Sequence, residues 1–177
     1  MGAVRDVEVG STAPAFTAPL VTPDGEVSEV SLSSLCEETA VLLVFQPTDF
    51  DLDTFAERAA LGEYDWFTAD DRLRVVGVNR ARPVTNREFA DYLDVTYPFC
   101  SDRDLSIAKA YGVTYRALGV APRARRACFF VDRDRVVRYQ WVGDRTTCGR
   151  ARPQARDLYE AVVDALGRPE PETFGMA

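Results

Sequence analysis

The chain has 177 residues and a formal net charge of −7, and 46% of its residues are apolar, which suffices for one domain with a sizeable core. It contains no histidine, so catalytic schemes with an imidazole base are excluded, including Ser-His and Cys-His pairs. No apolar run approaches the roughly 18–20 residues of a membrane span, and the polar first ten residues lack a signal-peptide core. We therefore expect a cytoplasmic domain over residues 1–167 and a tail over residues 168–177, with no membrane partner and no cofactor.

The basic residues are unusual in kind and in position. Lys109 is the only lysine beside 20 arginines, and 17 of the 28 acids are aspartates, which is typical of halophilic proteins or of GC-rich genomes. Residues 110–156 contain 11 arginines and only three acids. Such a basic stretch indicates a local anion site or self-association. Nucleic-acid binding is not expected, because no nucleic-acid motif is present.

The first predicted elements are a hairpin and a short helical turn. Ala15–Leu20 and Val27–Val30 flank the turn sequence TPDG and are predicted to pair as strands. Ser31–Cys36 predicts a short capped turn of helix. Ala40–Gln46 begins with six apolar residues in succession, which is typical of a strand buried on both faces.

Helices and strands then alternate. A helix is predicted over Asp51–Phe67, which has apolar residues at helical spacing and acids in its first turn. Leu73–Asn79 predicts a second buried strand. Two further helices are predicted over Thr85–Leu93, with Thr85 as the cap, and over Asp104–Tyr111.

The C-terminal part predicts a second hairpin and a closing helix. Ala127–Asp132 and Val136–Val142 are expected to be strands joined at residues 133–134, and Pro153–Leu166 has the spacing of an amphipathic helix. A parallel βαβ centre followed by an antiparallel hairpin indicates a thioredoxin-like α/β fold. We expect a central mixed sheet flanked by helices, with an N-terminal hairpin.

The turn after Ala40–Gln46 is the place where this layout calls for a functional group. A strand that ends in a loop leading into a helix offers free N–H groups to an anion or a thiolate. The sequence FQPTDF at 45–50 resembles the active-site approach of the peroxiredoxins, the alkyl hydroperoxide reductase and thiol-specific antioxidant family. That family has Pro, three residues, Thr or Ser, two residues, and then the peroxidatic Cys. In this frame Pro47 is kept, whereas Asp51 replaces the Thr and Thr54 replaces the Cys.

Other segments resemble the same family in the same order, most closely its bacterioferritin-comigratory-like branch. They are Val9–Phe16, Asp24-Gly25 with Ser31–Leu35, Tyr97–Asp102, Ala110–Val113 and Arg126–Asp132. The last of these resembles the strand that bears the family's active-site arginine. The resemblance covers most of the chain and implies a peroxiredoxin type of thioredoxin-like fold.

The resemblance also implies that the usual peroxidase chemistry is absent. In the family the Cys thiolate attacks a peroxide oxygen, and a Thr and an Arg orient the peroxide. This chain keeps Pro47 and Arg126, but the Thr54 hydroxyl needs an activating base and cannot form a sulfenic acid. Ala59 stands where some relatives have a resolving Cys. The leading prediction is a non-peroxidase binding or regulatory paralogue.

Two alternatives stay open. One is a thiol peroxidase that works through a relocated cysteine, Cys128 or Cys148, with a thioredoxin-like reductant as partner. Cys128 is two residues from Arg126 and thus on the same strand face, where a guanidinium would lower the thiol pKa, although a small core residue explains it as well. The other alternative is a structural subunit that pairs with an active peroxiredoxin or forms a homodimer. Cys36 and Cys100 are expected to be buried packing residues, Cys100 in a turn.

Arg126 needs a negative partner if the thiolate is gone. We expect either an ion pair with Asp51 or a small anion at Arg126, while a plain helix-start role for Asp51 stays open. Arginines around this position would suit an anionic ligand or form a solubilising face: Arg116, Arg123, Arg125, Arg126, Arg145, Arg150, Arg152 and Arg156. No metal is expected, because the cysteines form no CxxC pair and the alternating acids Asp49, Asp51 and Asp53 do not match a calcium loop.

Overall fold

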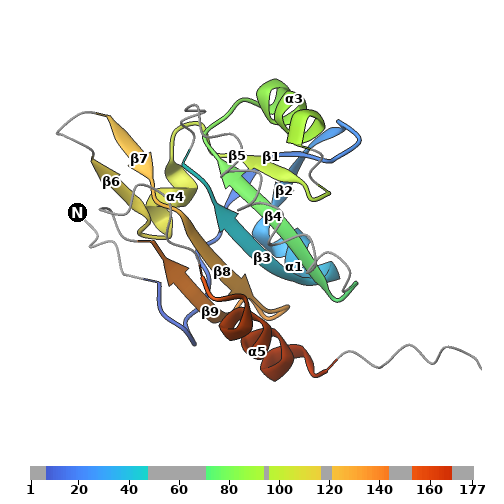
Figure 1. The fold of residues 1–177 in the computed structure, drawn as a ribbon, viewed down its shortest axis with the longest axis vertical. Helices are drawn as coiled ribbons and strands as arrows, with labels where there is room; N and C mark the ends of the chain where they lie inside the picture. The colour runs from blue at the N-terminus through green and yellow to red at the C-terminus, as the bar shows by residue number, and fades with distance from the viewer. Residues whose placement is uncertain (1–6, 48–70, 94–95, 117–120, 144–152, 169–177) are drawn as a thin grey trace, which may run out of the picture.

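A seven-stranded mixed sheet forms the centre of the computed structural model, which describes residues 7–47, 71–93, 96–116, 121–143 and 153–168. The strand order is β2-β1-β5-β4-β3-β8-β9 (Figure 1). The strands are β1 Thr17–Val21, β2 Val27–Ser31, β3 Ala40–Phe45, β4 Leu73–Asn79, β5 Phe99–Ser101, β8 Ala127–Val131 and β9 Val137–Val142. Strands β3, β4 and β5 are parallel, and the outer strands join them antiparallel. The predicted thioredoxin-like α/β fold with a central mixed sheet is thus confirmed.

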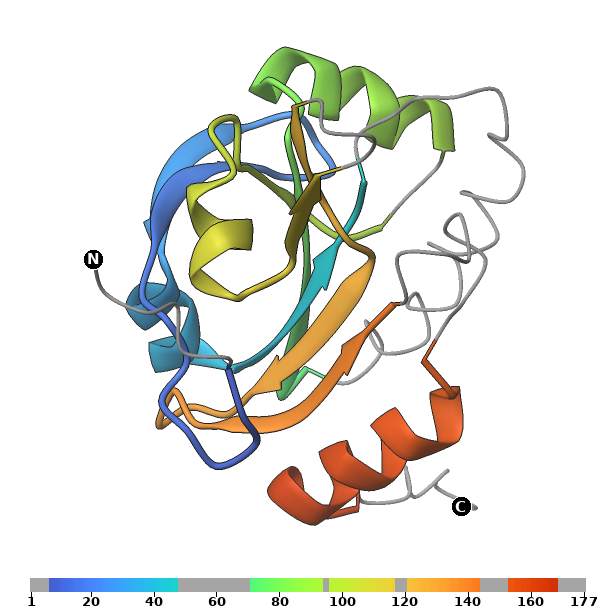
Figure 2. The same ribbon diagram turned by 90° about the vertical axis from the view of Figure 1, so that its left-hand side faces the viewer.

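Helices cover both faces of the sheet, and a small two-stranded ribbon lies at one end. The helices are α1 Leu32–Glu38, α3 Pro83–Leu93, α4 Ser106–Ala110 and α5 Ala155–Leu166, and the ribbon consists of β6 Thr114–Arg116 and β7 Pro122–Ala124. Figure 2 shows α1 and α4 on one side of the sheet and α5 on the other. None of the helices in the described ranges is long and apolar enough to cross a membrane.

Successive side chains of β3 point to opposite faces of the sheet, so the core consists of two clusters. Val41, Leu43 and Phe45 point to the face covered by α1 and α4, whereas Leu42 and Val44 point to the face covered by α3 and α5. All six residues of β3 are buried. A strand enclosed on both faces reads as an unbroken apolar run, as the sequence of β3 does.

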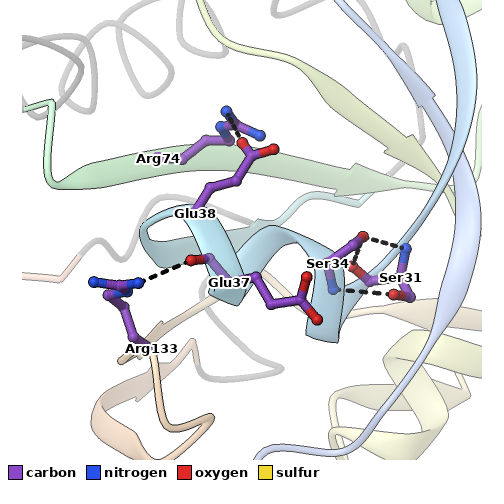
Figure 3. A network of polar contacts seen from close by, with 6 residues as sticks. All are labelled: Ser31, Ser34, Glu37, Glu38, Arg74 and Arg133. Carbon is purple, nitrogen blue, oxygen red and sulfur yellow. Dashed lines mark hydrogen bonds and ion pairs between the residues drawn. The ribbon is translucent and has the colours of Figure 1, made fainter.

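The start of α1 shows why a polar sequence forms a helix at this point. Ser31 and Ser34 make a reciprocal capping box, with each hydroxyl accepting from the other residue's backbone N–H at 3.1 Å (Figure 3). At the other end, Arg74 of β4 forms an ion pair with Glu38 at 2.7 Å, and Arg133 donates to the Glu37 carbonyl at 3.0 Å. Both ends of this short helix are therefore fixed by side chains.

Most predicted elements lie where the sequence patterns placed them, with two corrections. Helix α3 begins at Pro83, so Thr85 is inside the helix and is not its cap. Proline suits the first turn of a helix because its missing N–H would have no partner there. Cys100 lies in the short strand β5, which was not predicted, instead of in a turn. The helix expected over Asp51–Phe67 lies outside the described residues.

Candidate functional site

The candidate site lies where β3 ends and β8 begins. Phe45 is opposite Ala127 in the antiparallel pair, so Gln46 and Pro47 follow the end of β3 at the edge of the sheet where Arg126 precedes β8. The Gln46 N–H donates to the Val78 carbonyl at 2.9 Å, which extends the ladder with β4 by one residue. The register therefore places Pro47 and Arg126, which are far apart in the sequence, at the same edge of the sheet.

Arg126 is held by its backbone as it enters β8. Its carbonyl accepts a hydrogen bond from the Gly143 N–H at 2.8 Å, just beyond the end of β9. A Cβ on Gly143 would lie 3.0 Å from that carbonyl oxygen and 3.1 Å from the Trp141 ring, so a larger residue would push the strands apart. The Arg126 side chain is half-buried, and its Nε atom is fully enclosed. The guanidinium thus belongs to a fixed site and not to a free surface chain.

Gln46 is a buried polar residue at the same corner. Its side chain is 3% exposed, and its Nε2 atom has no hydrogen-bond partner among the residues that the structure describes. The Nε atom of Arg125 is also buried and has no hydrogen-bond partner among the described residues. Since buried polar groups are nearly always paired, this corner holds unused hydrogen-bonding capacity within the described ranges.

The thiols that the structure describes are all in the core. Cys36 is 1% exposed, and Cys100 and Cys128 are 0% exposed. Burial raises the pKa of Cys36 to about 11, with a further contribution from Asp132, and burial next to Asp102 raises the pKa of Cys100 to about 12. These shifts are opposite to what a reactive thiolate requires.

Cys128 packs as a core residue. It is paired with Val44 on one side and with Trp141 on the other, and it belongs to the cluster that Leu158 and Val162 of α5 cover. It is close to Arg126 in sequence, but its side chain is fully buried, whereas a reactive thiol must be accessible. The placement favours the packing interpretation of Cys128.

The predicted arginine cluster is dispersed over several elements. Arg116 and Arg123 are exposed on the β6–β7 ribbon, and Arg125 and Arg126 are half-buried before β8. Arg156 is on α5, where it pairs with Glu160 at 2.8 Å, and so does not line the corner at Arg126. This pairing supports the solubilising role for Arg156.

Several predicted site residues lie outside the described residues. They are Asp49, Asp51, Asp53, Thr54, Ala59, Arg145, Cys148, Arg150 and Arg152. The ion pair between Asp51 and Arg126 therefore stays a prediction. Within the described ranges, no group of three or more Cys, Asp or Glu residues could hold a metal ion.

The structure also reveals a buried polar network that sequence reasoning missed. Asn79, at the end of β4, donates to Asn86 of α3 at 2.7 Å, and Asn86 donates to the Ser101 hydroxyl of β5 at 3.1 Å. Asn79 also accepts from the Ala81 N–H at 3.0 Å. The sequence signal for this network was a polar residue at the end of each strand, since Asn79 is the last residue of β4 and Ser101 the last residue of β5. The network joins β4, α3 and β5 next to the candidate site.

A comparison with protein families matches residues 9–140 to the AhpC/TSA family. The chain is 29% identical over 143 residues to the chloroplastic 2-Cys peroxiredoxin BAS1 of Spinacia oleracea, which covers 77% of this chain and 52% of that protein. It is 27% identical to the alkyl hydroperoxide reductase C of Buchnera aphidicola, over 90% of this chain and 81% of that protein. The chain thus spans about half the length of the Spinacia oleracea protein.

Solved structures agree on the fold. The reduced 2-Cys peroxiredoxin of Plasmodium vivax superimposes with a TM-score of 0.71 at 22% identity, over 88% of this chain and 95% of that chain. Peroxidoxin BcpB of Mycobacterium tuberculosis gives a TM-score of 0.69 at 23% identity, over 90% and 98% of the two chains. Together with the family match across most of the sequence, these likenesses show that the chain belongs to the AhpC/TSA family of peroxiredoxins.

Proposed function

We propose that this protein is a peroxiredoxin-family member that has lost the usual peroxidase activity and acts as a binding or regulatory paralogue. At the family's peroxidatic position the sequence has Thr54, and at the position of the preceding Thr it has Asp51. A peroxidatic thiolate attacks one peroxide oxygen, the O–O bond breaks, water or an alcohol leaves after protonation, and the sulfur becomes a sulfenic acid. A threonine hydroxyl has no oxidation state equivalent to that product.

The observation that carries this proposal is the burial of the described thiols. Cys36, Cys100 and Cys128 are each at most 1% exposed. For Cys36 and Cys100, burial also raises the pKa, so that the protonated form dominates near neutral pH. A nucleophilic thiol must be both accessible and ionised, so the burial of these three thiols supports the proposal that none of them replaces the missing cysteine.

The corner at Arg126 supports a binding role. It retains an arginine with an enclosed Nε atom, a half-buried Pro47 and an amide of Gln46 whose Nε2 atom has no hydrogen-bond partner among the described residues. Guanidinium groups bind carboxylates and other oxyanions through charge-assisted hydrogen bonds. Under this proposal Asp51 or a small bound anion contacts Arg126.

Assembly with another peroxiredoxin chain belongs to the same proposal. β2 and β9 are the terminal strands of the sheet, although Val137 of β9 is already bonded to Gly10 and Ser11. β2 and the part of β9 beyond Val137 each offer a row of backbone groups to a second chain. A homodimer or a pair with an active family member would use such surfaces. Sedimentation of the protein alone tests for the homodimer, and sedimentation of a mixture with an active peroxiredoxin tests for the pair.

The direct test is intact mass after one equivalent of hydrogen peroxide with a sulfenic-acid trap, followed by peptide mapping. We expect no adduct within minutes on the wild-type protein or on the Cys148→Ser variant. The matched gain-of-function variant is Asp51→Thr with Thr54→Cys, which restores the family pattern; we expect it to form an adduct on the new cysteine.

Rapid adduct formation on Cys128 or Cys148 of the wild type would overturn the proposal and establish a relocated peroxidase. Loss of that adduct in Cys128→Ser or Cys148→Ser would then identify the working thiol. An inert double variant would show that the corner no longer supports peroxide chemistry even with a thiol present. Circular dichroism and thermal melting confirm that each variant is folded.

A further inference from the structure

A cavity of about 490 Å³ lies between α4 and the β6–β7 ribbon, and Figure 1 shows these two elements side by side. Its volume falls within the roughly 300–1,000 Å³ of pockets that bind small molecules. It is built from Leu105, Lys109, Tyr115, Arg116 and Pro122, together with Asp104 and Thr114. None of these residues belongs to the corner formed by Gln46, Pro47 and Arg126.

Two cationic side chains from different elements line this cavity. Lys109 is on α4 and Arg116 is at the end of β6, and both are exposed. Within the described part of the chain, the ion pairs are Arg74–Glu38, Arg138–Asp132 and Arg156–Glu160, and neither cavity cation takes part in one. On a chain with a net charge of −7, two cations without a carboxylate partner at one cavity mark a place for a negative ligand.

The remaining walls define the rest of the ligand. Leu105 is buried, and the Tyr115 ring is half-buried, so with Pro122 they offer an apolar surface to a flat body. Asp104 also reaches the cavity, and its carboxylate accepts from the Ser106 N–H at 3.1 Å. Hydrogen bonds from Ser106 lower the pKa of Asp104, so this carboxylate is ionised. A ligand with one anionic group and a separate hydrogen-bond donor would match both the two cations and the Asp104 carboxylate of this cavity.

The cavity is held by rigid parts of the fold. Buried Asp102 accepts from the Ile107 and Ala108 N–H groups at 3.0 and 2.8 Å, which fixes α4 relative to β5. Leu105 adopts a left-handed conformation with φ of 60°, so α4 begins directly after Leu105, on the side of Asp104. On the other wall, Arg116 is paired with Pro122 across the ribbon. Such preorganisation lowers the entropy lost on binding.

We propose that this cavity binds a small molecule with an oxyanion on an apolar or aromatic body. Lys109 and Arg116 contact the oxyanion, Leu105, Tyr115 and Pro122 contact the apolar body, and Asp104 accepts a hydrogen bond from a donor group. Carboxylates and phosphates share this chemistry. The proposal does not depend on the loss of peroxidase activity, since the cavity and the corner at Arg126 share no residue.

The single lysine makes a direct experiment possible. Reductive methylation with ¹³C-formaldehyde labels Lys109 and the N-terminal amine alone, and dimethylation keeps the charge of the ammonium group. The labelled protein is titrated with 4-aminobenzoate, 4-aminophenyl phosphate and neutral 4-aminobenzamide. We expect a saturable shift of the Lys109 signal with one or both anions and none with the amide, while the N-terminal signal stays unchanged. The stronger anion identifies the oxyanion class.

Two variants complete the test. Arg116→Gln removes one cation from the cavity, and we expect about a tenfold weaker affinity, in line with the loss of a charge-assisted hydrogen bond. Arg82→Gln removes an exposed arginine that does not line the cavity and should bind like the wild type. Absence of saturation with both anions, equal binding of the amide, or unchanged affinity in the folded Arg116→Gln protein would overturn the proposal.

Discussion

The two ends of the central sheet differ in how their charged and polar side chains are paired. At the end where β3 and β4 begin, Arg74 pairs with Glu38, Arg138 pairs with Asp132, and Arg72 donates to the Leu166 carbonyl at 2.9 Å. At the corner where β3 ends, Gln46 and Arg125 have enclosed nitrogen atoms without hydrogen bonds to other described residues. Among the described residues, the first end thus has these three bonded arginines and one unbonded hydroxyl, that of Thr39, whereas the second has these two unbonded nitrogen atoms beside the bonded amides of Asn79 and Asn86.

This difference resembles a general property of open α/β sheets. Ligands bind at the carboxyl ends of parallel strands, because loops there can change without disturbing the sheet. Here the parallel strands β3, β4 and β5 end at the candidate corner. A change of residues at this corner can therefore leave the ion pairs at the opposite end of β3 intact.

The largest loss of stability is expected at the end of the sheet where β3 and β4 begin, which we call the paired end. Asp132 is 8% exposed and accepts from the Val136 N–H at 2.8 Å and from Arg138 Nε at 2.6 Å. Asp132→Ala leaves both donors without this carboxylate, and we expect about 2–3 kcal/mol lower free energy of unfolding, measured by urea denaturation. Asp134→Ala, at an exposed neighbour, should change it by less than about 0.5 kcal/mol. Equal effects of the two variants would contradict the paired-end interpretation.

A smaller effect is expected from alkaline pH. Burial and Asp132 raise the pKa of Cys36 from 9.0 to about 11, so the folded state holds this proton to higher pH than the unfolded chain does. The stabilising contribution is complete below pH 9 and is lost as the pH rises from 9 to 11, because the unfolded thiol ionises first. Urea denaturation from pH 8 to 11 should show a shallower decline for Cys36→Ala than for the wild type. Parallel curves would exclude Cys36 as the titrating group.

The smallest effect is expected at the corner. Gln46→Met replaces a buried amide with an apolar side chain of similar size, and we expect the free energy of unfolding to rise by about 1 kcal/mol, because an unbonded buried amide carries a desolvation cost that the apolar side chain does not. The matched control is Asn86→Leu. Asn86 is 0% exposed and bonded to both Asn79 and Ser101, so its replacement should lower the free energy of unfolding by about 2–3 kcal/mol. A similar loss in both variants would show that the Gln46 amide is bonded in the native protein.

The sequence predicted long and strongly patterned elements well. β3 is an unbroken apolar run, β4 is mostly apolar with Arg74 near its start, and the hairpins have turn sequences, so local composition indicates them. β5, β6 and β7 have three residues each, and such short strands exist because a neighbouring strand pairs with them. Their residues alone contain no periodicity that could reveal the pairing.

The site likewise has features that the local sequence reveals and features that depend on neighbouring strands. The family pattern was sufficient to select Pro47 and Arg126, and the register of β3 with β8 places them at the same edge of the sheet. The different surroundings of the described arginines were not predictable, because Arg123 lies in β7 whereas Arg126, three residues later, precedes β8 of the central sheet. Burial of Gln46 also depends on neighbouring strands and not on its own position after an apolar run.

The position of α5 at the end of the described chain has a consequence for synthesis. Leu158 and Val162 of this helix cover the face of the sheet that contains Cys128 and Phe130. A ribosome delivers every strand of the sheet before it delivers α5, so α5 cannot cover this face of the nascent chain until residues 155–166 emerge. Chaperones that hold exposed apolar surfaces would therefore act on the nascent chain before α5 emerges.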